Sequence, residues 1–122
     1  EKSSLYKESL NKLDNEFLEN LTRLIEDNLQ SEKMDIAYLS GELSMSNSPL
    51  YRKVKALTGI STNEFIRKVK MKNAEQLLLT GKYNVSEVAF RVGMGSPIYF
   101  RQCFKEEFGL SPSEYLKKIK TD

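Results

Sequence analysis

The chain has 122 residues, 39% apolar and 30% charged, a length and balance typical of one compact domain or of two small units that share a core. No run approaches the roughly 20 apolar residues that a membrane-spanning helix needs, and the charged start does not resemble a signal peptide. The sequence lacks histidine and has one cysteine, Cys103, which excludes Ser-His catalysis, most metal sites and an internal disulfide. We therefore expect no enzymatic activity, no metal and no cofactor in this chain.

The net charge of +2 conceals an asymmetry between the two parts of the chain. Residues 1–45 carry five Lys/Arg and ten Asp/Glu, whereas residues 46–122 carry fourteen and seven. A basic body behind an acidic N-terminal part favours a polyanionic partner, and the alternative is an unevenly charged solvated surface. Because the chain begins at Glu1 rather than at Met, we also expect it to be part of a longer protein.

Nearly every long segment shows the apolar spacing of a helix, and none shows sustained alternation with period two, so we predict an all-α fold. The first helix carries the stripe Phe17 to Leu29 with Asp14 as its N-cap, and residues 1–13 are either a linker or an extension of this helix. Six further helices are predicted in chain order, at about residues 36–43, 47–57, 62–80, 85–92, 97–107 and 112–119.

Capping residues mark where these helices begin and end. Three predicted N-terminal caps share the pattern of a capping box, in which the cap side chain and a Glu three residues later satisfy each other's backbone N–H; they are Ser61 to Glu64, Asn84 to Glu87 and Ser111 to Glu114. Gly59 and Gly109 directly follow helical stripes, where a left-handed residue is favoured.

Two segments fifty residues apart, Lys55–Lys68 and Lys105–Lys118, share the glycine, the capping box and an aromatic residue. Each is preceded by a short helix, a turn and a second helix. The turns are at Ser44-Met45 and at Gly93-Met94-Gly95. This is the helix-turn-helix pattern, whose second helix lies in the major groove in DNA-binding examples. A duplicated unit suits a partner that itself repeats, as duplex DNA does.

Ten residues, most of them polar, occupy the predicted outer faces of the two second helices. They are Asn47, Ser48, Tyr51, Arg52 and Lys55 in the first copy and Pro97, Ile98, Arg101, Gln102 and Lys105 in the second. Arg can pair with guanine and Gln with adenine, while Ile can contact a thymine methyl. Ser46 and Ser96, as caps, lie where a phosphate can meet free backbone N–H groups. Many two-helix turns bind no DNA, so a helical protein-interaction module, docking a partner on its acidic first helix, is the alternative.

From about Asp14 to Lys118 the chain resembles the DNA-binding domain of AraC/XylS-type transcription regulators. The resemblance rests on three groups of residues: Ser46-x-x-x-Leu50-x-Arg52-x-Val54-Lys55 with Thr58-Gly59-Ile60-Ser61; Ala74-x-x-Leu77-Leu78; and Val88-Ala89-x-x-Val92-Gly93 with Ser96-x-x-Tyr99-Phe100-x-x-x-Phe104-Lys105 and Gly109-x-Ser111-Pro112-x-x-Tyr115. It implies seven helices in two helix-turn-helix subdomains, with the first unit at residues 14–61, a long connecting helix at 62–80 and the second unit at 81–120.

The resemblance also implies roles for individual residues. The first unit would contact bases through Ser48, Tyr51 and Arg52, with Asn47 beside them, and the second through Ile98, Arg101 and Gln102, with Pro97 beside them. Ser46, Lys55, Ser96 and Lys105 would contact DNA phosphates. The implied partners are double-stranded DNA and RNA polymerase, and no small-molecule site is expected.

The run Leu50–Lys55 further resembles the variant found at the C-terminus of hybrid two-component sensors of gut Bacteroidetes. That resemblance implies a parent protein with receiver and sensor domains, anchored in the inner membrane, that controls polysaccharide-use genes from a cytoplasmic DNA-binding domain.

Some positions depart from the family pattern or allow two interpretations. Met94 stands where the family usually has Phe, and Gln102 where it usually has Arg, which makes the base preference of the second unit harder to predict. Four cations on the connecting helix allow either a second phosphate contact or, the favoured interpretation, a solvated face; they are Arg67, Lys68, Lys70 and Lys72.

Overall fold

The computed structural model describes the backbone of residues 2–121 and the side chains of residues 11–120. Within that part the chain forms seven helices and no strand, as predicted. They are α1 (Lys2–Asp27), α2 (Ile36–Glu42), α3 (Asn47–Thr58), α4 (Thr62–Leu79), α5 (Val85–Arg91), α6 (Pro97–Phe108) and α7 (Pro112–Thr121). None of the described helices is long and apolar enough to cross a membrane.

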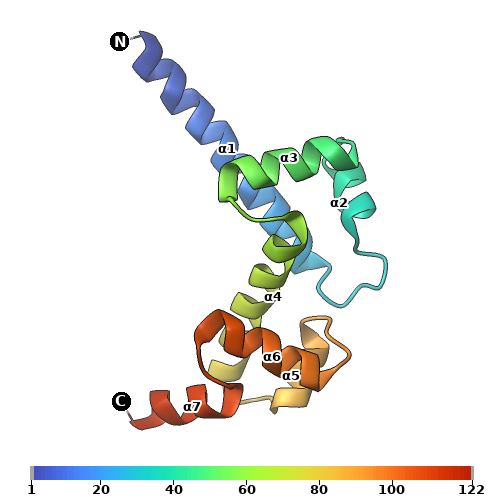
Figure 1. Ribbon diagram of the computed structural model, residues 1–122, viewed down its shortest axis with the longest axis vertical. Coiled ribbons are helices and arrows are strands. Elements are labelled where there is room, and N and C mark those ends of the chain that lie inside the picture. The colour runs from blue at the N-terminus through green and yellow to red at the C-terminus, as the bar shows by residue number, and fades with distance from the viewer. Residues whose placement is uncertain (1, 122) are drawn as a thin grey trace.

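Two hydrophobic cores lie at opposite ends of α4, which belongs to both (Figure 1). The first core is aliphatic and draws its fully buried side chains from α1, α2 and α3: Leu21, Ile25, Leu39, Leu50 and Val54. The second core is built largely from α5 and α6 and contains Phe100 and Phe104. Along α4, Val69 packs into the first core, whereas Met71, Ala74 and Leu78 pack into the second. One helix therefore holds both units in place.

Helix α1 differs from the prediction at its N-terminal end. It begins at Lys2, so Asp14 lies in the helix interior and is not an N-cap. The reason is that residues 1–27 contain no Gly or Pro to interrupt a helix, and a helix already started by buried residues such as Leu21 extends at little cost per residue. In Figure 1 the first turns of α1 extend beyond the rest of the molecule.

The turns inside the two helix-turn-helix units share a backbone hydrogen bond and a positive-φ residue, although the second turn is one residue longer, at 92–96 against 43–46. The N–H of Met45 donates to the Ser40 carbonyl and that of Met94 to the Ala89 carbonyl, both at 2.8 Å. The residue before each methionine has a positive φ, 56° at Ser44 and 78° at Gly93. The duplication therefore includes the turn, although one copy places serine where the other requires glycine.

Gly93 is required because the turn packs against the end of the first unit. A Cβ added there would lie 1.8 Å from the Leu29 carbonyl oxygen, far inside any real contact distance. The next residue, Met94, is buried in the second core, so methionine fills the place where the family usually has phenylalanine.

The predicted caps are largely confirmed. Gly59 and Gly109 end α3 and α6 in the left-handed conformation, with φ of 80° and 79°. Both halves of the capping box form at Asn84 and at Ser111. At Ser61 the Glu64 N–H donates to the serine Oγ at 3.1 Å, but among the described residues the return bond from the Glu64 carboxylate is missing, so that box is half formed.

Three polar contacts join α4 to α1, α6 and α7 beside the two cores. The Lys68 ammonium forms an ion pair with Glu107 of α6 at 2.9 Å. The Asn73 side chain donates to Glu26 of α1 at 3.0 Å. The Tyr115 hydroxyl of α7 donates to Glu75, and this hydrogen bond raises the pKa of Tyr115.

Candidate nucleic-acid interface

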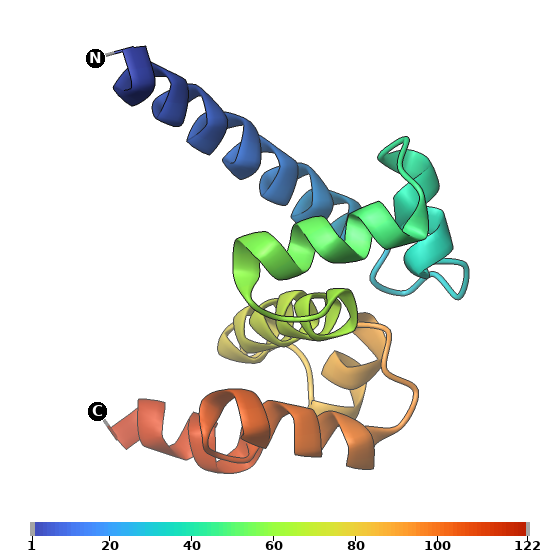
Figure 2. The ribbon, with the colours of Figure 1, turned by 45° about the horizontal axis from the view of Figure 1, so that its top comes forward.

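Helices α3 and α6 lie on either side of α4 and run in roughly the same direction (Figures 1 and 2). Each is twelve residues long, begins at a serine N-cap and ends at a left-handed glycine. The two helices have equal lengths, follow turns with a matching hydrogen bond and end at matching left-handed glycines, and both pack on one shared helix, so they are oriented alike. The molecule thus presents two equivalent helices toward one side.

The outer face of α3 carries the side chains that the sequence assigned to it. Asn47, Ser48, Tyr51, Arg52 and Lys55 are all exposed, while Leu50 and Val54 are fully buried on the opposite face. Four of the exposed residues, from Asn47 to Arg52, line one shallow hollow together with Ile36 of α2. A guanidinium, a phenol and two short polar side chains at one hollow suit contacts with base edges.

The outer face of α6 also follows the prediction, with one addition. Arg101, Gln102 and Lys105 are exposed, and Ile98 is 71% exposed, whereas Pro97 is half-buried in the first turn. The addition is Tyr99, which is 48% exposed. Its exposure could have been predicted from the sequence, because Tyr99 precedes the core residue Phe100 by one position and therefore points away from it.

The two serine caps are in different states. The Ser96 Oγ accepts the Tyr99 N–H at 3.2 Å, the usual capping bond. Ser46 occupies the N-cap of α3 but its side chain makes no capping bond, so its hydroxyl is free to contact a phosphate. Both hydroxyls are exposed at the N-terminal end of their helix.

The two lysines assigned to phosphate contacts lie near the C-terminal ends of α3 and α6. The Lys55 ammonium donates to the Gly59 carbonyl at 2.9 Å, which uses one of its three N–H groups. Lys105 lies close enough to Glu114 to contribute to its lowered pKa, although the hydrogen bonds with Ser111 are the larger cause. Neither lysine forms an ion pair within the part of the chain that the structure describes.

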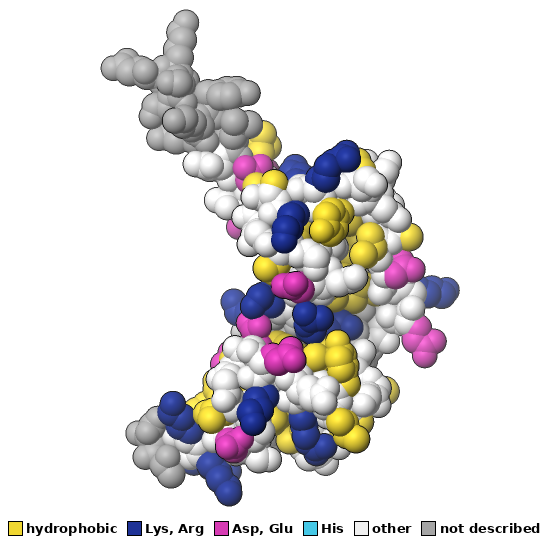
Figure 3. All heavy atoms as spheres, viewed as in Figure 1, with side chains coloured by type: hydrophobic (Ala, Val, Ile, Leu, Met, Phe, Trp, Pro, Cys, Tyr) yellow, Lys and Arg dark blue, Asp and Glu magenta, His cyan; other side chains and the backbone are white. Residues whose placement is uncertain are grey.

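Figure 3 shows that Lys and Arg side chains are spread over both units on the face where α3 and α6 lie in front, with Asp and Glu side chains among them. Residues 11–120 contain no group of three His, Cys, Asp or Glu side chains that could hold a metal ion. The chemistry of this face is therefore that of a polar, partly basic surface with two projecting helices.

Comparison with protein families and known proteins agrees with this geometry. The chain matches the family described as "Helix-turn-helix domain" over residues 39–118. It is 38% identical over 107 residues to "Histidine kinase P4" of Formosa agariphila, covering 88% of this chain but 8% of that protein. It is 32% identical over 120 residues to the "Virulence regulon transcriptional activator VirF" of Yersinia enterocolitica, covering 97% of this chain and 44% of that protein.

The fold is also similar to those of solved structures of DNA-binding regulators. A DNA-binding transcriptional dual regulator from Escherichia coli K-12 superposes with a TM-score of 0.76 at 26% identity, over 84% of this chain and 90% of that chain. The DNA-binding domain of AdpA, determined in complex with a target DNA, superposes with a TM-score of 0.74 at 29% identity, over 85% and 93%. With the family match, the paired helices and the shared α4, these comparisons show that the chain belongs to the AraC-type helix-turn-helix DNA-binding domains.

Proposed function

We propose that this chain is the sequence-specific DNA-binding domain of a bacterial transcription activator, and that it places α3 and α6 in two successive major-groove segments on one side of a duplex. The observation that carries the proposal is the parallel arrangement of two capped, polar-faced helices on α4 (Figure 2). Two such helices on one side of a molecule suit a duplex as partner, because it presents its major groove to one side once per turn.

The roles of the exposed residues follow from their positions on the two helices. Asn47, Ser48, Tyr51 and Arg52 of α3 would contact bases, as would Pro97, Ile98, Arg101 and Gln102 of α6, because these residues lie in the N-terminal halves of the two helices and all except the half-buried Pro97 are exposed. Ser46, Ser96, Lys55 and Lys105 would contact phosphates from the two ends of these helices. The two sets of base-contacting side chains differ in chemistry, so the preferred site is expected to be asymmetric rather than palindromic.

The parent protein is proposed to be a hybrid two-component regulator. The support is the identity to a histidine kinase of which this chain spans only 8%. Under this proposal residues 14–120 are the DNA-binding domain, and residues 2–13 lengthen α1 toward preceding receiver and sensor domains. The domain would act in the cytoplasm, where it would regulate polysaccharide-use genes and interact with RNA polymerase. The sensor part of the parent protein would be anchored in the inner membrane.

Selection of bound sequences from a random duplex pool tests this function directly. We expect one enriched site with two unlike half-sites separated by about one helical turn, roughly 10 base pairs. Binding to that site should weaken steeply as salt rises, since lysine and arginine contacts release condensed counterions. A protein-interaction module would enrich no sequence, and that outcome would reject the proposal.

A further inference from the structure

Three neighbouring shallow hollows, each sharing lining residues with the next, extend from the outer face of α3, across α4, to the start of α6. The hollow at α3 shares Ile36 with a second hollow between α2 and α4. That second hollow shares Asn63, Ile66 and Lys70 with a third, which reaches Ser96 and Tyr99 of α6. The path therefore connects the exposed faces of the two helices that are proposed to enter successive major-groove segments.

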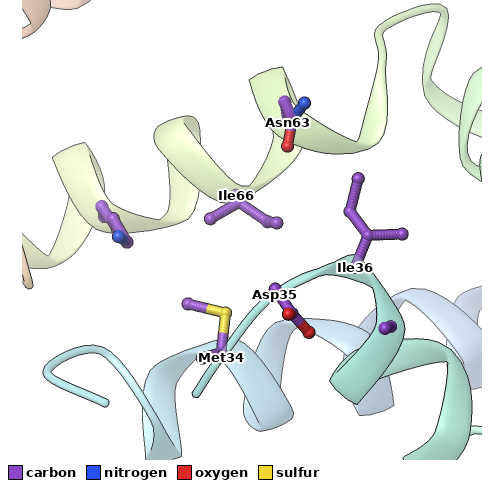
Figure 4. A pocket seen from close by; sticks show the side chains of 7 residues that line it. Met34, Asp35, Ile36, Asn63 and Ile66 are labelled. Atoms are coloured by element: carbon purple, nitrogen blue, oxygen red, sulfur yellow. The ribbon is translucent and has the colours of Figure 1, made fainter. Parts of the chain in front are cut away.

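The floor of this path is one face of α4. Asn63, Ile66, Arg67 and Lys70 recur with the spacing of three and four residues that places helical side chains on a common side. Figure 4 shows the half of the path next to α2, where Ile66 faces Met34 and Ile36 across the hollow. The groove is therefore lined by apolar side chains next to α2 and by polar side chains along α4.

The charge is uneven along the groove. The half next to α6 is lined by Arg67 and Lys70 and by no carboxylate. The half next to α2 includes Asp35, whose carboxylate accepts the Tyr38 N–H at 2.7 Å as the cap of α2. The neighbouring Lys68 is already paired with Glu107. The basic part of the groove is therefore the half next to α6.

Lys70 is the distinctive side chain of that half. It is partly buried, and burial lowers its pKa. Its ammonium lies beside the Gly93 turn, 3.4 Å from the place where a Cβ of residue 93 would stand. Among the residues that the structure describes, neither Lys70 nor Arg67 has a hydrogen-bond or ion-pair partner. A partly desolvated cation gains most from an anion that restores its lost hydration.

We propose that Arg67 and Lys70 bind the phosphate backbone of duplex DNA where it passes between the two major-groove segments. The inference rests on the proposed function, because the groove joins the faces of α3 and α6 and a backbone must cross this part of the molecule when both helices are in the groove. The occupant is a DNA phosphodiester, since the side chains are cationic, lie in an open groove and continue the surface that faces DNA. The solvated face favoured from sequence then applies to Lys72 and not to Lys70.

The test compares the DNA affinity of variants that each lose one positive charge at a different position of α4. Lys70→Gln and Arg67→Gln remove the proposed contacts, Lys70→Arg keeps the charge, and Lys72→Gln removes an exposed charge that lines no part of the groove. Binding of the 122-residue chain to the duplex selected by the unmodified chain is measured by fluorescence anisotropy at several salt concentrations. Thermal unfolding of each variant establishes that it folds.

We expect Lys70→Gln to weaken binding about fivefold and to reduce the slope of log affinity against log salt by about 0.9, as the loss of one phosphate contact should. Lys70→Arg should restore most of the affinity, and Lys72→Gln should change it less than about twofold. Equal effects of Lys70→Gln and Lys72→Gln would overturn the inference while leaving the proposed function intact. Absence of duplex binding by the unmodified chain would reject both.

A modified duplex gives a second, independent measurement. A neutral methylphosphonate replaces one phosphate midway between the two half-sites, on each strand in turn. The unmodified chain should lose about the affinity that Lys70→Gln loses on ordinary DNA, and Lys70→Gln should lose nothing further on the modified duplex. Additive losses would contradict a direct contact. This experiment and Arg67→Gln decide the question even if Lys70→Gln does not fold.

Discussion

The two helix-turn-helix units have similar backbone folds but differ in the residues that fill their cores and in the side chains that they expose. The first unit has an aliphatic core, a serine at the positive-φ turn position and a polar outer face on α3. The second has an aromatic core, a glycine at that position and the exposed Ile98 on α6. The helix lengths, the hydrogen bond in the turn and the terminal glycines match in the two units, whereas the side chains that face outward have diverged. Duplication therefore supplied equal orientation, and divergence supplied two different surfaces.

The largest expected difference between the units is in their cores. Phe104→Ala removes a buried ring that contacts Phe100, Phe108 and Tyr115 at centroid distances of 4.5–6.0 Å. Val54, at the corresponding position of the first unit, is equally buried but smaller. We expect Phe104→Ala to lower the free energy of unfolding by about 3–5 kcal/mol. Val54→Ala should lower the free energy of unfolding by less, and denaturant unfolding of both variants measures the difference. Equal losses of unfolding free energy would show that the aromatic cluster adds no stability of its own.

The positive-φ position of the turn should separate the units next. Gly93→Ala combines about 1–2 kcal/mol of left-handed strain with a clash against the Leu29 carbonyl. We expect it to lower the free energy of unfolding by about 2–4 kcal/mol, since overpacking alone costs about 1–3 kcal/mol. Ser44→Ala, at the matching position, already has the positive φ of a residue with a Cβ. Its effect should be below about 0.5 kcal/mol, as for an exposed surface change, and a comparable loss in both variants would refute the role of the Leu29 contact.

Binding should distinguish the two kinds of exposed residue on α3. Arg52→Ala is expected to weaken binding to the selected site by about 1–3 kcal/mol and to relax base preference at one position. Lys55→Ala should weaken binding to selected and random duplexes alike, because a phosphate contact carries no sequence information. Titration of both duplexes with each variant checks the assignment. A uniform loss for Arg52→Ala, or a sequence-selective loss for Lys55→Ala, would exchange their roles.

The smallest effect is expected at the ion pair between the units. Lys68 is half exposed, so its pair with Glu107 is largely screened by solvent. Lys68→Gln should lower the free energy of unfolding by about 0.2–1 kcal/mol, with less effect at high salt. Thermal unfolding at two salt concentrations measures it. A larger, salt-insensitive loss would mean that the orientation of the units depends on this contact more than on the shared cores.

Much of this structure could be predicted from local signals. The left-handed Gly59 and Gly109, the Asn84 cap and the outward position of Arg52 each depend on residues within one helix turn, which is the range over which spacing and capping rules apply. The predicted N-cap at Asp14 was wrong because it could not be decided from the residues within one helix turn. An aspartate is compatible with both a cap and a helix interior, and only the continuation of the helix through residues 2–13 decided between them.

The sequence by itself determined the seven helices, the duplicated units and the residues on the outer faces of α3 and α6, because helical period, caps and turn residues are local. Only the tertiary structure decided which helical faces meet. It placed Lys70 beside the Gly93 turn and joined Ile36, Ile66 and Tyr99 along one groove, although these residues lie up to sixty-three positions apart. The physical reason is that α4 belongs to two cores at once, and that packing sets which of its cations are solvated and which line the groove between the units.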